Sequence, residues 1–286
     1  LVTLMTENVD NFNIQPPKYL PDVYPKAKDV MSVDVVTVSE DTTLLKVMEI
    51  MRERKVNFIP VLDGHGRPKG VLTLMDLAWR YMVKMEVERS TEVVASFNNI
   101  MDNLNGAAVL DFLGGVQSRF SIYVGAMAVE SFLETLKDKD PRGCAVVVGD
   151  RDDIQRSAVE KGIGLLVISG GFSVKEPVLE IAKKNRVSII ISPLDSASTA
   201  LLVKFSTPAS MVCDTEFEKV GPDELVDDIK FRLAKAPGML VLDPDGGMQG
   251  VITKSNVLKP SGTSLILVDH NEMAQAVDGA EQVNIA

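Results

Sequence analysis

The sequence predicts an α/β protein in which two copies of one α+β unit flank a small, Rossmann-like domain with a parallel sheet. Residues 70–76, Gly-Val-Leu-Thr-Leu-Met-Asp, recur as residues 250–256, Gly-Val-Ile-Thr-Lys-Ser-Asn, and each copy follows an apolar strand and a glycine-containing turn. Between the copies, fully apolar strands alternate with helices, which is typical of a parallel sheet covered on both faces. An internal repeat identifies an architecture more directly than local propensity does.

The first repeat unit is expected over residues 26–86 in the order β-α-β-β-α. Ser39 to Thr43 supplies helix-start residues, and the apolar side chains that follow fall on one helical face. The expected elements are a strand at 35–38, a helix at 44–54, strands at 57–62 and 69–73 around the turn 64–66, and a helix at 75–85.

The second repeat unit is expected over residues 206–260 in the same order, beginning near Thr207. A short strand is predicted at 217–220. Pro222 is predicted to open a helix, because Asp223 and Glu224 would suit the dipole of its first turn. Two strands around the turn 244–247 and a final helix from Ser255 complete the unit.

The intervening domain is expected over residues 87–205. Residues 86–140 are predicted to be mostly helical, with an interruption at Gly114-Gly115. Three apolar strands then alternate with helices, at 145–148, 165–168 and 187–191, and these form the predicted parallel sheet.

Charge and composition restrict the function. A formal net charge of −10 over 286 residues argues against nucleic-acid binding and against an anionic membrane surface, since both need a broad basic surface. No apolar run is long enough to span a bilayer, which predicts a cytoplasmic protein without a membrane partner. Cys144 and Cys213 are expected to be buried free thiols in a reducing compartment. Two histidines, His65 and His270, are too few for a His-rich metal centre.

Particular motifs then resemble known domains. The two units, each ending in Gly-apolar-apolar-Thr-x-x-Asp/Asn, resemble a tandem pair of cystathionine-β-synthase (CBS) domains. Asp150-Arg151 and Ser169-Gly170-Gly171, at successive strand ends of the intervening domain, resemble a DRTGG domain with serine in place of the usual threonine. A CBS–DRTGG–CBS order is similar to the regulatory insert of manganese-dependent family II inorganic pyrophosphatases.

The C-terminal residues extend this resemblance. Residues 266–272, Ile-Leu-Val-Asp-His-Asn-Glu, are similar to the segment with which the catalytic DHH domain of those enzymes resumes. The resemblance implies that residues 261–286 begin that domain, that the Pro-rich residues 1–25 are a linker and remnant of its other part, and that Asp269 is a manganese, cobalt or magnesium ligand in the intact enzyme. The chain has neither the N-terminal His/Asp-rich motif nor an Asp-His-His triplet, so the segment alone is expected to be inactive.

The first candidate site centres on Thr73 and Asp76. The residues alone are compatible with a simple helix cap, in which these side chains satisfy free N–H groups. The resemblance implies instead an adenylate site, with the Asp76 carboxylate on the ribose hydroxyls and Thr73 facing the phosphate. The candidate contacts around adenine are Val35, Val36, Asn57 and Pro60.

The second candidate site, at Thr253, differs from the first. Asn256 replaces the acidic residue, and Lys254 offers a positive charge for phosphate. Met239, at the start of the preceding strand, would pack against adenine only weakly. We therefore expect two unequal sites.

The function that follows is an adenine-nucleotide sensor. The resemblance implies that AMP or ADP inhibits pyrophosphate hydrolysis by flanking catalytic domains, that a diadenosine polyphosphate activates it, and that CBS modules form a homodimer. The alternative is a CBS/DRTGG sensor in another class of protein, such as a transcriptional regulator. For Asp150, Arg151 and residues 169–171 the sequence favours turn and capping roles over a ligand.

Overall fold

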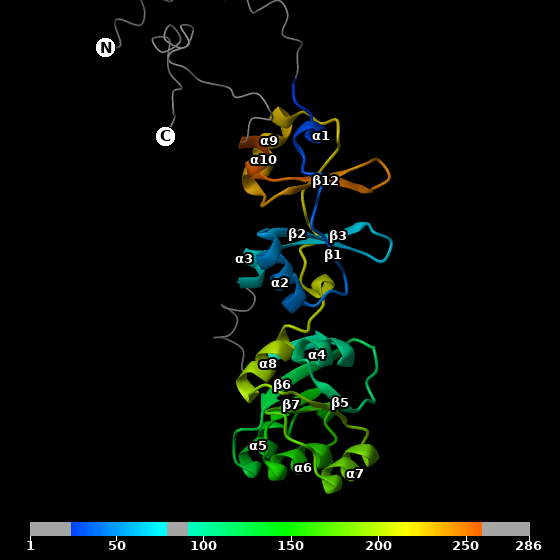
Figure 1. Cartoon of the computed structure of the whole chain (residues 1–286), viewed down its shortest axis with the longest axis vertical. Coiled ribbons are helices and arrows are strands. Elements are labelled where there is room, and N and C mark those ends of the chain that lie inside the picture. The colour runs from blue at the N-terminus through cyan, green and yellow to red at the C-terminus, as the bar shows by residue number, and fades with distance from the viewer. Residues whose placement is uncertain (1–23, 79–90, 259–286) are drawn as a thin grey trace, which may run out of the picture. The chain divides into compact units, whose positions relative to one another are not determined.

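The computed structural model describes residues 24–78 and 91–258 (Figure 1). Asp269, His270 and the segments expected to belong to catalytic domains lie outside the described residues. Among the described residues, contacts define two compact units. One contains residues 24–33, 219–242 and 249–258; the other contains residues 34–78, 91–218 and 243–248.

The first repeat is a three-stranded sheet in the order β1-β2-β3. β1 (Val38–Ser39) runs parallel to β2 (Phe58–Leu62), and β2 pairs antiparallel with β3 (Pro68–Thr73). α2 (Leu44–Arg54) connects the parallel strands, and α3 (Leu74–Ala78) follows β3. β1 is shorter than the predicted strand at 35–38, because only Val38 and Ser39 find partners on β2.

The predicted helix at 44–54 is confirmed at both ends. Thr43 caps it by accepting a hydrogen bond from Lys46 N, and Lys55 ends it in a left-handed conformation with φ of 55°. Its apolar face packs on the sheet, which buries a core from which water is excluded. This core contains Leu44, Val47, Met51, Ile59, Val61, Leu72 and Leu77.

The second repeat forms a three-stranded sheet in the order β10-β11-β12, with β10 parallel to β11. Its elements are β10 (Lys219–Val220), α9 (Val226–Lys235), β11 (Met239–Leu242), β12 (Met248–Ile252) and α10 (Lys254–Leu258). The β-α-β-β-α order of the first repeat is therefore confirmed in the second.

A short segment that precedes each repeat's first strand packs on the sheet of the other repeat. The first exchanged segment, residues 25–32, contains α1 (Ala27–Val30), and its Ser32 pairs with Val251 of β12. The second exchanged segment, residues 207–214, contains the short helix η5 (Ala209–Met211), and its Asp214 pairs with Val71 of β3. Residues 207–214, which the sequence assigns to the second repeat, therefore pack on the first. The repeats exchange segments and are not separated by a single boundary near Thr207.

The exchange explains where α9 begins. A helix was predicted to open at Pro222, but α9 begins at Val226. Ala27 N donates to Glu224 O and Val226 N donates to Pro25 O, both at 2.8 Å. Because the main chain before Val226 is used to bind the first exchanged segment, it cannot form the intrahelical hydrogen bonds of a helical turn.

The intervening domain has a six-stranded mixed sheet in the order β4-β6-β7-β8-β9-β5. The four central strands, β6 to β9, are parallel to one another, and each edge strand runs antiparallel to the central strand beside it. The strands are β4 (Thr91–Ala95), β5 (Ala107–Leu110), β6 (Ser118–Val124), β7 (Cys144–Val148), β8 (Leu165–Ile168) and β9 (Ser188–Ile191). The three predicted parallel strands are confirmed as β7, β8 and β9.

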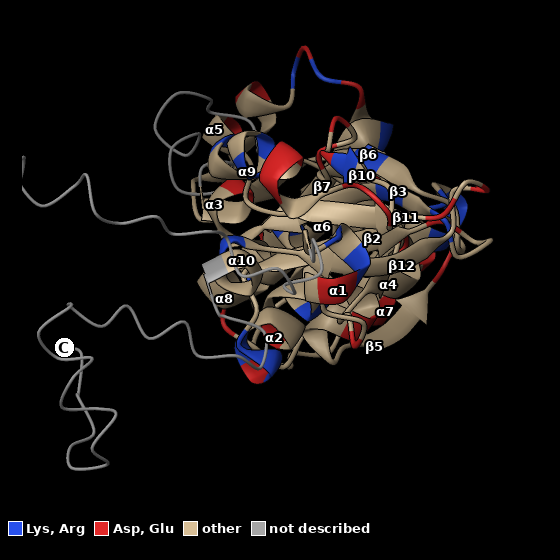
Figure 2. Ribbon diagram, turned by 90° about the horizontal axis from the view of Figure 1, so that it is seen from above, with Lys and Arg blue, Asp and Glu red and all other residues tan. Residues whose placement is uncertain are grey.

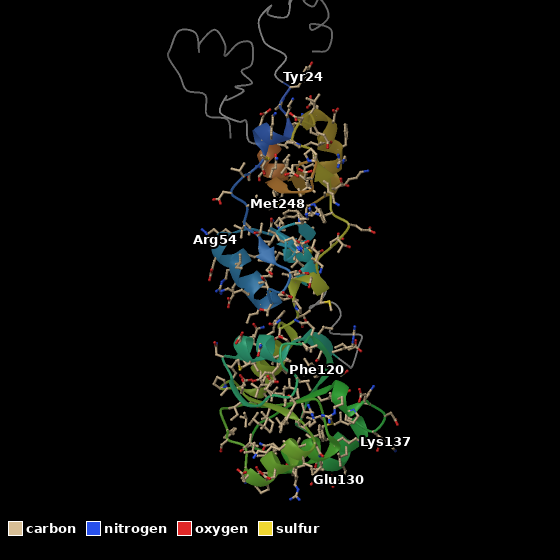
Figure 3. The ribbon with its side chains drawn as sticks, turned by 90° about the vertical axis from the view of Figure 1, so that its right-hand side faces the viewer. Tyr24, Arg54, Phe120, Glu130, Lys137 and Met248 are labelled. Carbon is tan, nitrogen blue, oxygen red and sulfur yellow. The ribbon has the colours of Figure 1, made fainter. Side chains whose placement is uncertain are left out.

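Helices cover both faces of this sheet. One core includes Phe132, Ile154 and Val178 against Val146 and Val148; the other includes Phe97, Ile100 and Val203 against Ala145 and Val147. Phe120, labelled in Figure 3, is 1% exposed in the second core. The helices are α4 (Phe97–Leu104), α5 (Val129–Thr135), α6 (Asp152–Lys161), α7 (Glu176–Lys184) and α8 (Ser196–Lys204), with a short helix η4 (Pro141–Gly143) before β7.

The prediction that residues 86–140 are mostly helical is wrong. Among the described residues, this stretch supplies the strands β4, β5 and β6 as well as α4 and α5. In β6, Phe120 and Ile122 are buried while the intervening Ser121 is half-buried, so the burial alternates along the strand. That period of two belongs to a strand rather than to a helix.

The described surface is mixed in charge. Figure 2 shows acidic and basic residues interspersed along the helices. None of the described helices is both long and apolar enough to cross a bilayer.

Candidate functional site

The first repeat junction lies where β3 passes into α3. Thr73 N and Thr73 Oγ1 donate to Asp76 Oδ2 at 3.0 and 2.6 Å, and Asp76 N donates back to Thr73 Oγ1 at 3.1 Å. This reciprocal pattern is a capping box. The bonds fix the rotamers of both side chains, as the helix-cap interpretation predicts.

The capping box leaves one acceptor of Asp76 available. Both bonds from Thr73 go to Oδ2, and no hydrogen bond to Oδ1 is formed by any residue in the described parts of the chain. Asp76 is half-buried, whereas Thr73 is only 8% exposed. A carboxylate held in a fixed orientation with a free oxygen can accept hydrogen bonds from ligand hydroxyls.

The other residues predicted for the first site differ in exposure. Asn57 is exposed and lies next to the junction, because its carbonyl accepts from Leu74 N at 3.1 Å. Pro60 is buried within β2 and pairs with Val71. Val35 and Val36 lie in the connection before β1, where both are half-buried and Val36 also packs against the core.

The second junction repeats the cap with different atoms. Thr253 N and Thr253 Oγ1 donate to Asn256 Oδ1 at 2.9 and 2.7 Å, and Thr253 Oγ1 also bonds the Ser255 hydroxyl at 2.8 Å. Lys254 is exposed at the start of α10. Its ammonium group is therefore accessible to an anion from solvent.

Met239 is not placed where a ligand could reach it. Its side chain is fully buried in the core with Ile229, Leu233 and Val241. The register explains this position: Val241 pairs with Val220 as Val61 pairs with Val38, which makes Met239 the counterpart of the core residue Ile59. We therefore omit Met239 from the site.

The sequence did not predict the contact between the second junction and the first exchanged segment. The amide nitrogen of Asn256 donates to Val30 O at 3.1 Å and to Ser32 Oγ at 2.9 Å, both in the first exchanged segment. A second, weaker repeat in the sequence could have predicted the exchanged segments. Residues 27–32, Ala-Lys-Asp-Val-Met-Ser, have the same Ala-x-x-Val spacing as residues 209–214, Ala-Ser-Met-Val-Cys-Asp.

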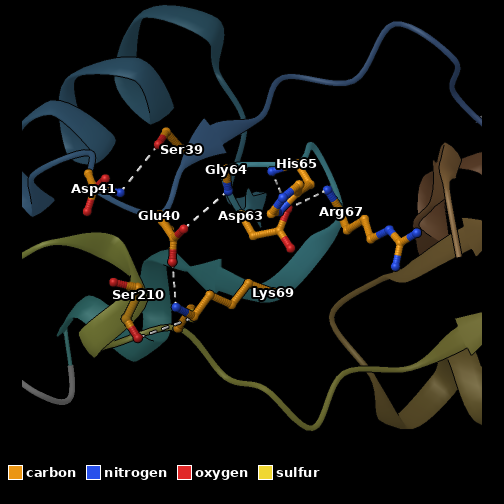
Figure 4. A network of polar contacts seen from close by, with 10 residues as sticks. Ser39, Glu40, Asp41, Asp63, Gly64, His65, Arg67, Lys69 and Ser210 are labelled. Carbon is orange, nitrogen blue, oxygen red and sulfur yellow. Dashed lines mark hydrogen bonds and ion pairs between the residues drawn. The ribbon is translucent and has the colours of Figure 1, made fainter.

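A polar network lies beside the first repeat's hairpin turn (Figure 4). Lys69 Nζ is 2.5 Å from Glu40 Oε2, and Gly64 N donates to Glu40 Oε1 at 3.2 Å. The hydrogen bond from Lys69 lowers the pKa of the Glu40 carboxyl, and the same bond raises the pKa of Lys69. His65 lies in the exposed turn, where His65 N donates to Asp63 Oδ1 at 2.8 Å. The network ties the turn to the segment after β1.

The DRTGG-like residues form structural contacts. Arg151 pairs with Asp153 and donates to the carbonyl of Met127, while Asp150 is exposed. The Ser169 hydroxyl bonds the Ser196 hydroxyl at 2.6 Å. Gly170, with φ of 80°, and Gly171, with φ of 70°, adopt the left-handed conformation that favours glycine. These contacts agree with the predicted turn role of the glycines and with the local pairing of Arg151. The predicted capping role of Asp150 is wrong, because the N-cap position of α6 is Arg151 and no side chain caps the helix there.

The described residues offer neither a metal-binding cluster nor an activated thiol. They contain no group of three or more His, Cys, Asp or Glu side chains that could hold a metal ion. Cys144 and Cys213 are free, and burial raises the pKa of both thiols.

Two known domain families match parts of this chain. The family model of the CBS domain matches residues 27–82, and that of the DRTGG domain matches residues 99–205. The second repeat has the strand order and register of the first. The chain is a CBS pair with a DRTGG domain.

Two relatives that match nearly the whole of this CBS–DRTGG chain are inorganic pyrophosphatases. The cobalt-dependent enzyme of Clostridium perfringens is 27% identical over 281 residues, which are 97% of this chain and 50% of that protein. A probable manganese-dependent enzyme of Thermotoga maritima is 28% identical over 276 residues, 96% of this chain and 50% of that protein. The CBS–DRTGG chain therefore spans about half the length of the curated relatives it matches.

A solved structure is similar to most of this chain. It is the crystal structure of the CBS and DRTGG domains of the regulatory region of Clostridium perfringens pyrophosphatase, in complex with its activator, diadenosine tetraphosphate. It has a TM-score of 0.66 and 26% sequence identity, and the match covers 80% of this chain and 100% of that chain. Homology to pyrophosphatases favours the first functional interpretation over a transcriptional regulator.

Proposed function

We propose that the CBS–DRTGG chain is the adenine-nucleotide-binding regulatory region of an inorganic pyrophosphatase. The observation that carries the proposal is the Thr73–Asp76 junction, where a capping box orients a carboxylate whose Oδ1 atom has no hydrogen-bond donor among the described residues. The similar regulatory region from Clostridium perfringens, which binds an adenine nucleotide activator, supports it. In this proposal the Asp76 carboxylate accepts from ribose hydroxyls and Thr73 lies beside the phosphate.

Regulation would follow from differential affinity for two states of the protein. AMP or ADP would stabilise a state of low activity, and a diadenosine polyphosphate would stabilise a state of high activity. A coupling free energy of about 1–3 kcal/mol is enough for a change of severalfold or more in activity. The reaction controlled would be hydrolysis of pyrophosphate by a metal-dependent catalytic domain, with Asp269 among its manganese, cobalt or magnesium ligands.

The second junction would bind a nucleotide through other groups. Thr253 and the exposed Lys254 would face phosphate, and the site would be weaker than the first because it lacks a carboxylate. The chain would act in the cytoplasm as a homodimer joined through its CBS domains, which sedimentation of the chain at several concentrations would test.

Calorimetric titration with AMP and with diadenosine tetraphosphate tests nucleotide binding. The native chain should release or absorb heat with both ligands, and Asp76→Ala should weaken binding of AMP by about tenfold or more, as expected for loss of a hydrogen bond to a charged group. Glu130→Ala, which removes an exposed carboxylate on α5, is the matched control and should bind as the native chain does. Absence of heat with the native chain, or equal affinities for the two variants, would overturn the proposal.

A further inference from the structure

The side chain of Asn256 has no hydrogen-bonding capacity left. A primary amide offers two acceptor lone pairs and two donor hydrogens. Thr253 N and Thr253 Oγ1 occupy the acceptor, and the Val30 carbonyl and the Ser32 hydroxyl occupy the donors. We call the two donor bonds to residues 30 and 32 the Asn256 clasp. A ligand hydroxyl could bond this amide only by displacing one of these partners.

The orientation of the amide follows from its partners. Thr253 N can only donate, so it must face Oδ1, and the Val30 carbonyl can only accept, so it must face Nδ2. A flipped amide would lose both bonds and leave two partly buried polar groups unpaired, which is costly. The clasp therefore holds the amide in one orientation.

The first repeat cannot form this clasp. Asp214 corresponds to Ser32, because Asp214 pairs with Val71 as Ser32 pairs with Val251. Asp76 corresponds to Asn256, and two carboxylates have no hydrogen to share between them. Asp214 Oδ1 instead accepts from Glu216 N at 2.9 Å. The two repeats thus carry a matched difference, with Ser and Asn in one and Asp and Asp in the other.

We propose that the discrimination of ribose from deoxyribose by this chain resides in Asp76 rather than in Asn256, and that Asn256 is a positioning residue of the second junction that fastens the first exchanged segment. This inference rests on the proposed nucleotide binding. A ligand at the second junction is held by groups other than Asn256, so the second junction accepts an adenylate whether or not its sugar carries the hydroxyl that Asp76 reads.

The test compares the affinities of AMP and deoxyadenosine monophosphate by calorimetry. The native chain should prefer AMP by about tenfold or more, the effect of one hydrogen bond to a carboxylate. Asp76→Ala should reduce this preference to about twofold or less, or abolish binding of both ligands. Asn256→Ala should leave the preference as it is in the native chain. Because Asn256→Ala could disturb folding, Ser32→Ala, which keeps the amide and the bond to Val30, should also leave the preference unchanged.

The outcomes separate the inference from the proposed function. A preference lost in Asn256→Ala or Ser32→Ala but kept in Asp76→Ala would overturn the inference while nucleotide binding stands. Absence of AMP binding to the native chain would overturn the proposed function and the ribose assignment with it.

Nuclear magnetic resonance reads the clasp without relying on affinity. In Ser32→Ala, one side-chain amide proton of Asn256 should move to the chemical shift of a proton that has lost its hydrogen-bond partner. When AMP saturates the native chain, this proton should not move to that position, because a ligand held by Thr253 and Lys254 leaves the clasp intact. The amide resonances of Thr73 and Asp76 should shift in the same titration. Movement of the Asn256 proton to its Ser32→Ala position with saturating AMP would show that the ligand replaces a clasp partner and would overturn the inference.

Discussion

A Cβ atom on Gly70 would lie 2.6 Å from the Sγ atom of Cys213, in the second exchanged segment. At the matching place in the other repeat, a Cβ atom on Gly250 would lie 2.8 Å from the Sδ atom of Met31. Real Cβ contacts are not this short, so the close approach of each exchanged segment requires glycine. The glycine that opens both copies of the sequence repeat is therefore explained by packing rather than by a ligand.

Gly70→Ala should lower the free energy of unfolding by about 1–3 kcal/mol, the usual cost of overpacking. The reason is that main-chain Asp214 O, 2.7 Å from the added methyl group, cannot move without breaking the pairing of Asp214 with Val71. Urea denaturation measures the change. Gly64→Ala, where nothing lies within 4 Å, is the matched control; equal losses in the two variants would contradict the packing explanation.

Thr73→Val should destabilise the chain by about 1 kcal/mol, since it removes the hydroxyl of the capping box and keeps the shape of the side chain. Thermal unfolding gives the shift. Thr73→Ser keeps the hydroxyl and should change stability much less. If both variants were equally stable, the bonds between Thr73 and Asp76 would have no role in capping α3.

The Glu40–Lys69 pair predicts a loss of stability in acid. The folded-state pKa of Glu40 is lowered by Lys69, so the stabilisation is present above the ordinary pKa of a glutamate and is lost as the pH falls through the lowered value. Lys69→Met should therefore be less stable than the native chain at pH about 7, and the difference should shrink as the pH falls below about 5. Thermal midpoints across this range measure it. A difference that grew in acid would contradict the assignment.

The two thiols should react slowly with iodoacetamide at neutral pH. Burial raises the pKa of Cys144 and Cys213, which keeps both as thiols, and the thiolate is the reactive form. Cys213 should be alkylated before Cys144, because it is less buried and Lys69 partly offsets the rise in its pKa. Lys69→Met should slow alkylation of Cys213 and leave Cys144 unchanged, as mass spectrometry of the labelled peptides would show.

Local sequence patterns predicted the helices and strands whose caps and apolar faces lie within one continuous stretch of residues. The helix at 44–54 has its cap, its apolar face and its end in a continuous stretch. The strands β7 and β8 and most of β9 are buried on both faces, so they read as unbroken apolar runs.

Elements that depend on distant partners were not predictable in this way. β4 (91–95) pairs with β6 (118–124). Each of these strands buries only a few side chains, which alternate with more exposed ones. The start of α9 at Val226 depends on residues 25–28, far away in the sequence. The sequence alone predicts a ligand role for Met239 because it does not show the strand register. The pairing of β11 with β10 places Met239 in the core.

The candidate site was predicted in part for the same reason. Thr73 and Asp76 are three residues apart, and their bonds follow from helix capping. Ser32 and Asn256 meet only because the exchanged segment reaches β12, so no local motif contains them both. The difference between the two junctions became visible with the contacts of the exchanged segments.

The exchanged segments also set an order for the folding steps that take place while the chain is made on the ribosome. When the first repeat leaves the ribosome, the edge of β3 at Val71 has no strand partner until Asp214 has been made, and the whole intervening domain is translated in between. An unpaired strand edge is a site for mispairing with other chains. The DRTGG domain, whose described strands and helices are continuous in the sequence, can fold first and bring residues 207–214 back to the waiting sheet.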